Sequence, residues 1–140
     1  MVRRFSPVTE GESMAEAVHI LLAEDNPADV YLIEEALREH GVQFQLKVAQ
    51  DGEQAIQLLT QDDARFDVVL LDLNMPKRGG SEVLEKLHGN TVPVIVLTSS
   101  DSPADRMQAM RLGATHYIRK PTGLDDFLAI GGVIKEIVHR

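Results

Sequence analysis

Short apolar runs alternate with amphipathic segments along this chain of 140 residues, and this alternation limits the fold more than any other feature. Most of the runs are continuously apolar, which is typical of strands that are buried on both faces. The segments between them carry apolar residues at helical spacing. Together they predict an α/β fold with a parallel sheet covered on both faces. The five expected strands are 18–23, 44–48, 67–72, 93–97 and 115–119.

Capping patterns mark where the intervening helices begin and end. Asn26-Pro27 and Ser102-Pro103 each place a capping side chain before a proline, which suits the first helical position. Gly41 and Gly113 follow the first and fourth helical segments and are expected to end them. Five helices are expected in all, and the last of them is 124–138.

Length and composition predict one domain, 18–140, preceded by a flexible tail, 1–17. The chain has no cysteine, which excludes disulfides and thiolate metal sites. The net charge of −8 disfavours non-specific binding to nucleic acid. No apolar stretch approaches the ~20 residues that a membrane span requires, and no signal peptide is recognisable. We therefore expect a cytoplasmic protein that binds neither nucleic acid nor a membrane.

Carboxylates follow two of the expected strands. Asp72 ends the most apolar run, and Glu24-Asp25 ends the first one. In open α/β sheets, ligands bind outside the carboxyl ends of the strands, so these acids are expected to meet. Each like-charged pair would repel by roughly 4 kcal/mol at about 4 Å and intermediate dielectric. A hard divalent cation such as Mg²⁺, which prefers oxygen ligands, would relieve this repulsion.

Four motifs at the strand ends carry a family resemblance. They are Leu-Ala-Glu-Asp-Asn at 22–26, Leu-Asp-Leu-Asn-Met-Pro at 71–76, Val-Ile-Val-Leu-Thr-Ser at 94–99 and Tyr-Ile-Arg-Lys-Pro at 117–121. In this order, the set resembles the receiver domain of two-component response regulators over 18–140. The resemblance implies a flavodoxin-like, doubly wound, five-stranded parallel sheet of order 2-1-3-4-5 with five helices.

The resemblance also assigns the phosphoryl chemistry. It implies that Asp72 accepts a phosphoryl group from a sensor histidine kinase, and that Thr98 and Lys120 contact the new phosphoryl oxygens. Thr98 and Tyr117 would form the switch, since an aromatic side chain at this position often changes rotamer with the threonine. The chain would then be a phosphoacceptor signalling protein, not an enzyme with a separate substrate, and would lose its phosphoryl group only slowly.

The metal ligands follow from the same resemblance. It implies that Asp25, Asp72 and the backbone carbonyl of Asn74 bind Mg²⁺, with Glu24 acting on the metal mostly through water. Mg²⁺ is the only cofactor expected.

Within the family, residues 74–80 and 25–29 resemble the single-domain, phytochrome-associated response regulators. A phytochrome-type photoreceptor kinase is therefore one candidate for the phosphoryl donor. The output would be binding to a downstream protein, or relay of the phosphoryl group to it, under the control of phosphorylation.

Two other functions remain open on the sequence. A phosphohydrolase that forms an aspartyl phosphate on a similar sheet is disfavoured, because such enzymes have a second Asp two residues after the nucleophile, where this chain has Asn74. A degenerate receiver that serves only as a binding module is disfavoured because all five site residues, from Glu24 to Lys120, are present.

Two further expectations concern the end of the chain. The last helix carries a second apolar stripe of Ile130, Val133 and Ile137, which predicts a partner surface, most simply a homodimer. The Lys120–Pro121 bond is expected to be cis, turning Lys120 inward.

Overall fold

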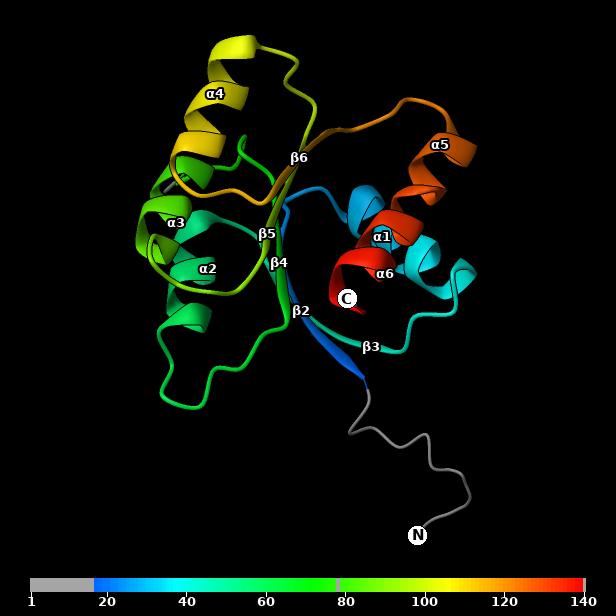
Figure 1. Ribbon diagram of the computed structural model, residues 1–140, viewed down its shortest axis with the longest axis horizontal. Helices are drawn as coiled ribbons and strands as arrows, with labels where there is room; N and C mark the ends of the chain where they lie inside the picture. The colour runs from blue at the N-terminus through cyan, green and yellow to red at the C-terminus, as the bar shows by residue number, and fades with distance from the viewer. Residues whose placement is uncertain (1–16, 78, 140) are drawn as a thin grey trace, which may run out of the picture.

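A five-stranded sheet lies between two layers of helices in the computed structural model, which describes residues 17–77 and 79–139 (Figure 1). Every pair of neighbouring strands is parallel. Counted in chain order, the strands lie in the spatial order 2-1-3-4-5, which confirms the predicted fold class. Across the sheet they are β3 (Phe44–Ala49), β2 (Val18–Ala23), β4 (Val68–Leu71), β5 (Val94–Thr98) and β6 (His116–Arg119).

Helices cover both faces of the sheet because side chains of successive strand residues point to opposite faces. Ile20 and Leu22 join one core cluster, whereas Leu21 and Ala23 join the other. The first cluster lies under α1 (Pro27–Glu39), α5 (Leu124–Leu128) and α6 (Ile130–Val138) (Figure 1). The second lies under α2 (Gly52–Leu59), α3 (Gly80–Leu87) and α4 (Pro103–Arg111).

The predicted caps place the helix starts at the carboxyl edge of the sheet. The Asn26 side chain accepts a hydrogen bond from the Ala28 amide at 3.0 Å, and the Ser102 side chain, which caps α4, accepts one from the Asp105 amide at 3.3 Å. Gly80 begins α3 where a Cβ atom would lie 2.7 Å from the Cα of Leu73. Only glycine therefore lets α3 start so close to the end of β4.

The segment predicted as one last helix is divided at Ala129 into α5 and α6. The Gly132 amide donates to the Ala129 carbonyl at 3.1 Å, and the Leu128 carbonyl accepts a hydrogen bond from His40 Nε2 at 3.1 Å. A Cβ atom on Gly131 would collide with the Ala36 carbonyl of α1. The close approach of α1 thus accounts both for the glycine and for the interruption, neither of which helical periodicity reveals.

This division corrects the predicted interface. Ile130 and Ile137 are buried in the core, at 4% and 9% exposure, and of the predicted stripe only Val133 is exposed. Leu124, the first residue of α5, is 59% exposed. The expected stripe assumed one uninterrupted helix, whereas the apolar positions after Ala129 pack against the sheet and α1. Ile130 and Ile137 are therefore not part of a free surface.

Two smaller expectations have different outcomes. The predicted tail lies outside the described residues except for Ala17, which is buried. The expected cis bond before Pro121 is wrong, because the bond is trans and Lys120 reaches the site in that form.

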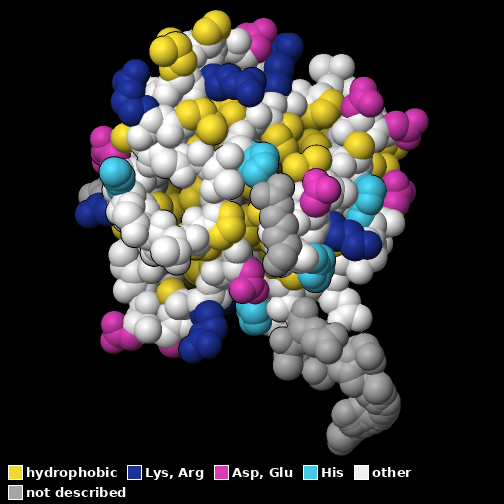
Figure 2. Space-filling view, in the orientation of Figure 1, with side chains coloured by type: hydrophobic (Ala, Val, Ile, Leu, Met, Phe, Trp, Pro, Cys, Tyr) yellow, Lys and Arg dark blue, Asp and Glu magenta, His cyan; other side chains and the backbone are white. Residues whose placement is uncertain are grey.

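None of the described helices has the length and apolar character needed to cross a bilayer. On the face drawn in Figure 2, acidic and basic side chains are interspersed, with apolar atoms exposed between them.

Candidate functional site

The carboxyl edge of the sheet gathers ionisable side chains from distant parts of the sequence. Glu24 and Asp25 follow β2, Asp72 follows β4 and Lys120 follows β6. These residues meet because parallel strands all end on the same edge. Thr98, the last residue of β5, is fully buried at this edge.

Three carboxylates form a cluster that could hold a metal ion. One oxygen from each of Glu24, Asp25 and Asp72 lies within 4.8 Å of the other two. Glu24 and Asp72 are buried and Asp25 is exposed, so the cluster opens to solvent on one side. Carboxylate oxygens are hard ligands that suit Mg²⁺ and similar divalent cations. The donor set therefore fits the predicted metal.

The Lys120 ammonium neutralises part of this negative charge. Its Nζ lies 2.8 Å from Glu24 Oε1, 2.8 Å from Asp29 Oδ2 and 3.0 Å from Asp72 Oδ2. Burial acts to lower the pKa of Lys120, but the hydrogen bonds to the three carboxylates outweigh it and raise the pKa above its usual value. Lys120 is therefore a permanent cation in the site.

Glu24 is the acid most affected by its surroundings. Burial raises its pKa, the hydrogen bond from Lys120 lowers it, and the charge of Asp72 raises it again, giving a pKa of about 7. The Asn26 amide also donates to Glu24 Oε2 at 3.2 Å. Without a metal, Glu24 is thus protonated in a substantial fraction of molecules near neutral pH.

The Asp72 carboxylate is oriented by contacts to both of its oxygens. Oδ1 accepts a hydrogen bond from the Asn74 amide at 3.0 Å, and Oδ2 accepts one from Lys120. The Asn74 side chain in turn donates to Thr98 Oγ1 at 3.3 Å, which links the ends of β4 and β5. The structure thus brings together the predicted residues, while the metal-binding role of the Asn74 carbonyl stays a prediction.

Tyr117 contacts the same edge through the loop between β5 and α4. Its hydroxyl donates to the Ser100 carbonyl at 3.1 Å, and the Ser100 hydroxyl donates to Asp105 Oδ2 at 2.6 Å. The Ser100 amide donates weakly to Thr98 Oγ1 at 3.4 Å. Ser100 therefore connects both predicted switch residues to the start of α4.

Sequence reasoning missed two residues that contact the site. The sequence places Asp29 only within the motif at 25–29, yet its carboxylate binds Lys120. Nothing in the sequence around Ser100 indicates a role at the site, apart from its place in a turn-forming segment. Both contacts depend on where the first turns of α1 and α4 lie relative to the sheet, which no local pattern specifies.

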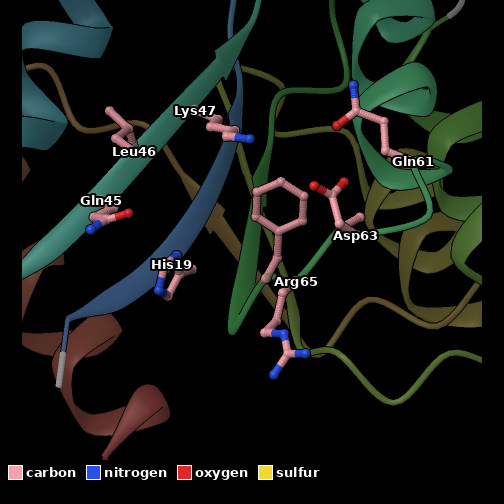
Figure 3. Close-up of a pocket in the computed structure, with 9 residues that line it drawn as sticks. His19, Gln45, Leu46, Lys47, Gln61, Asp63 and Arg65 are labelled. Carbon is pink, nitrogen blue, oxygen red and sulfur yellow. The ribbon is translucent and has the colours of Figure 1, made fainter. Parts of the chain in front are cut away.

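A hollow of about 390 Å³ lies away from this site and shares no lining residue with the acidic cluster. Gln45, Lys47 and His19 line it from β3 and β2, and Arg65 lies in the segment before β4 (Figure 3). Figure 3 shows the labelled side chains spread apart, whereas at the site three carboxylates all contact the Lys120 ammonium.

Comparisons with a family model and with curated proteins all point to the same protein family. Residues 20–130 match the family model of the response regulator receiver domain. Response regulator Rcp1 of Synechocystis is 35% identical over 124 residues, which cover 81% of this chain and 84% of Rcp1. Response regulator MprA of Mycolicibacterium vanbaalenii is 36% identical over 114 residues, but these make up only 48% of MprA. The chain spans about half the length of MprA and of similar curated relatives.

Solved structures agree with the sequence relatives. The crystal structure of the phosphorylated cyanobacterial phytochrome response regulator RcpA superposes with a TM-score of 0.80 at 34% identity, covering 88% of this chain and 94% of that one. The Mn²⁺-bound form of Rcp1 gives a TM-score of 0.76 at 33% identity, covering 85% and 92%.

Proposed function

Because the chain belongs to the family of response regulator receiver domains, we propose that it accepts a phosphoryl group on Asp72 from a sensor histidine kinase. The phosphorylated form would act as an interaction switch, or pass the phosphoryl group to a downstream protein. One observation carries this proposal: the buried Asp72 carboxylate lies beside two other acids at the carboxyl edge of the sheet, and it contacts a lysine that is hydrogen-bonded to three carboxylates.

The geometry suits transfer to a carboxylate. An Asp72 oxygen would form the new bond to phosphorus as the phosphorus–nitrogen bond of the donor phosphohistidine breaks. Such transfer depends on positioning and on charge neutralisation more than on covalent assistance. Lys120 supplies a cation 3.0 Å from Asp72, and Thr98 supplies a buried hydroxyl beside Asn74. Both could contact the phosphoryl oxygens, with Thr98 and Tyr117 forming the proposed switch.

We propose Mg²⁺ as the metal, held by Asp25, Asp72 and the Asn74 carbonyl, with Glu24 acting mostly through water. When bound, it would offset the repulsion between the carboxylate nucleophile and the anionic phosphoryl group. The three oxygens within 4.8 Å of one another support this site, as does the Mn²⁺-bound structure of the relative Rcp1.

For the partner, we propose a phytochrome-type kinase as the first candidate. The support is the likeness to RcpA, which is described as a cyanobacterial phytochrome response regulator. Phosphotransfer from purified candidate kinases tests this proposal, and efficient labelling by a non-phytochrome kinase alone would contradict it. A cytoplasmic location and slow loss of the phosphoryl group remain proposals of the same kind.

A homodimer also remains a proposal, but its predicted surface must change. Val133 is the one predicted interface residue that is exposed, at 37%. Val133→Glu should keep the fold and weaken association, as measured by light scattering with and without phosphorylation. A wild-type protein that stays monomeric in both states would contradict the proposal.

Labelling with a small phosphodonor tests the central proposal. With Mg²⁺ and acetyl phosphate, wild type should gain about one acid-labile phosphate that decays slowly, and Asp72→Asn should gain none while keeping its fold. Rapid multiple turnover of the donor would favour the phosphohydrolase, and an unlabelled wild type would favour the degenerate binding module. Full labelling of Asp72→Asn would place the phosphate on another residue.

A further inference from the structure

Three carboxylates hold Lys120, but only two of them belong to the metal cluster. Glu24 and Asp72 are cluster members, whereas Asp29 is not. Asp29 lies in the first turn of α1, and its Oδ2 accepts a hydrogen bond from Lys120 Nζ at 2.8 Å. Both side chains are largely buried, at 18% and 12% exposure. This contact joins the start of α1 to the residue after β6.

An ammonium group has three N–H donors, and the three carboxylates use all of them. The phosphoryl oxygens on Asp72 would draw on these donors, so up to two of the existing contacts must be given up. A metal at the cluster gives Glu24 and Asp72 a second cation. Asp29 lies outside the cluster, and among the described residues its one ion pair is with Lys120. The Asp29 contact is therefore the one that persists.

We propose that Asp29 is a positioning residue for phosphoryl transfer: it fixes the Lys120 ammonium beside Asp72 while the other two donors turn to the phosphoryl oxygens. This inference rests on the proposed phosphoacceptor function. A lysine side chain has four rotatable carbon–carbon bonds, and holding it in place before the reaction avoids ordering it in the transition state. Asp29 does so from the fixed first turn of a helix that packs on the sheet.

The test compares phosphorylation rates with acetyl phosphate and saturating Mg²⁺. Asp29→Asn should lower the rate constant about tenfold, within the range that modest misplacement of a catalytic group produces. It should leave the Mg²⁺ midpoint, measured by thermal unfolding, within about twofold of wild type. Asp29→Glu keeps the charge and should recover part of the rate.

Asp101→Asn is the matched control. Asp101 lies just beyond the end of β5, is 72% exposed and pairs with Arg119 at 3.6 Å, so its removal changes the net charge equally without touching Lys120. Its rate should equal that of wild type. In a Lys120→Ala background, Asp29→Asn should cause no further loss, because a residue that acts through Lys120 has no effect once the lysine is gone.

Several outcomes would overturn the inference. An Asp29→Asn rate equal to or above wild type would show that Asp29 does not assist, or that it competes for the lysine. An equal loss in Asp101→Asn would indicate a general charge effect. If Asp29→Asn lowered the phosphorylation rate by the same factor in the Lys120→Ala background, Asp29 would not act through Lys120. An unlabelled wild type would instead overturn the proposed function, and the inference with it.

Discussion

The site and the hollow in Figure 3 both contain acidic and basic side chains, but these side chains are largely buried and paired at the site and exposed at the hollow. At the site, Glu24, Asp72 and Lys120 are nearly buried and lie within 3.0 Å of a partner. At the hollow, Lys47 and Arg65 are exposed. The difference shows the effect of bringing charged groups together in a buried place. Burial strengthens electrostatic interactions, so the carboxylates at the site repel one another in a way that a metal or a phosphoryl group can change. Exposed charges, by contrast, are screened by water.

The largest expected effect is the loss of Lys120. Lys120→Ala leaves three carboxylates without their cation, and removing one member of a buried ion pair costs about 3 kcal/mol or more. Urea denaturation at pH 8 without Mg²⁺ measures the free energy of unfolding. Lys47→Ala, at the hollow, is the control and should change it by less than about 0.5 kcal/mol. Equal effects of the two substitutions would remove the distinction between these regions.

Magnesium should stabilise the fold through the site alone. At a free concentration ten times its Kd, Mg²⁺ should raise the free energy of unfolding by about 1.4 kcal/mol. Asp25→Asn should abolish most of this gain and raise the stability of the metal-free protein, because it removes one of three like charges. Thermal unfolding with and without Mg²⁺ measures both.

Asp63→Asn is the matched control for the magnesium experiment, since Asp63 lines the hollow instead of the site. It should keep the full response to Mg²⁺. A wild type indifferent to millimolar Mg²⁺ would show that the three carboxylates do not form a shared metal site.

A smaller effect follows from the pKa of Glu24, which burial raises from 4.5 to about 7. A raised pKa means that the folded protein binds a proton more tightly than the unfolded chain. The resulting stability is fully present below pH 4.5 and is lost as the pH rises through 7. Without metal, stability should therefore fall by about 1 kcal/mol between pH 6 and pH 8.

Magnesium binding should change with pH in the opposite direction. If the metal requires ionised Glu24, its affinity at pH 6 should be about tenfold weaker than at pH 8. Glu24→Gln removes the titrating group and should flatten both dependences, which distinguishes Glu24 from the histidines. A wild-type profile that Glu24→Gln leaves unchanged would contradict the assigned pKa.

Local patterns in the sequence predicted the α/β fold class and the acidic cluster, whereas the strand order and the roles of Thr98 and Lys120 followed from the family resemblance. Apolar runs locate the strands, and the ends of parallel strands meet on one edge, which accounts for Asp72, Thr98 and Lys120. The errors concern packing between distant elements. Ile130 and Ile137 were assigned to a surface because the contact of Gly131 with α1, where the last helix is interrupted, is not visible in helical periodicity. Asp29 was missed for the same reason.

The smallest expected effect concerns Arg65, which lines the hollow. Arg65 is exposed there, so its charge is screened within about 8 Å at physiological ionic strength. Arg65→Ala should change the free energy of unfolding by less than about 0.5 kcal/mol and leave both the Mg²⁺ midpoint and the phosphorylation rate unchanged. The same denaturation, thermal unfolding and labelling assays used for Lys120→Ala measure all three. A clear shift in the rate alone would mean that the hollow is coupled to the site through the sheet, and that the two regions act together.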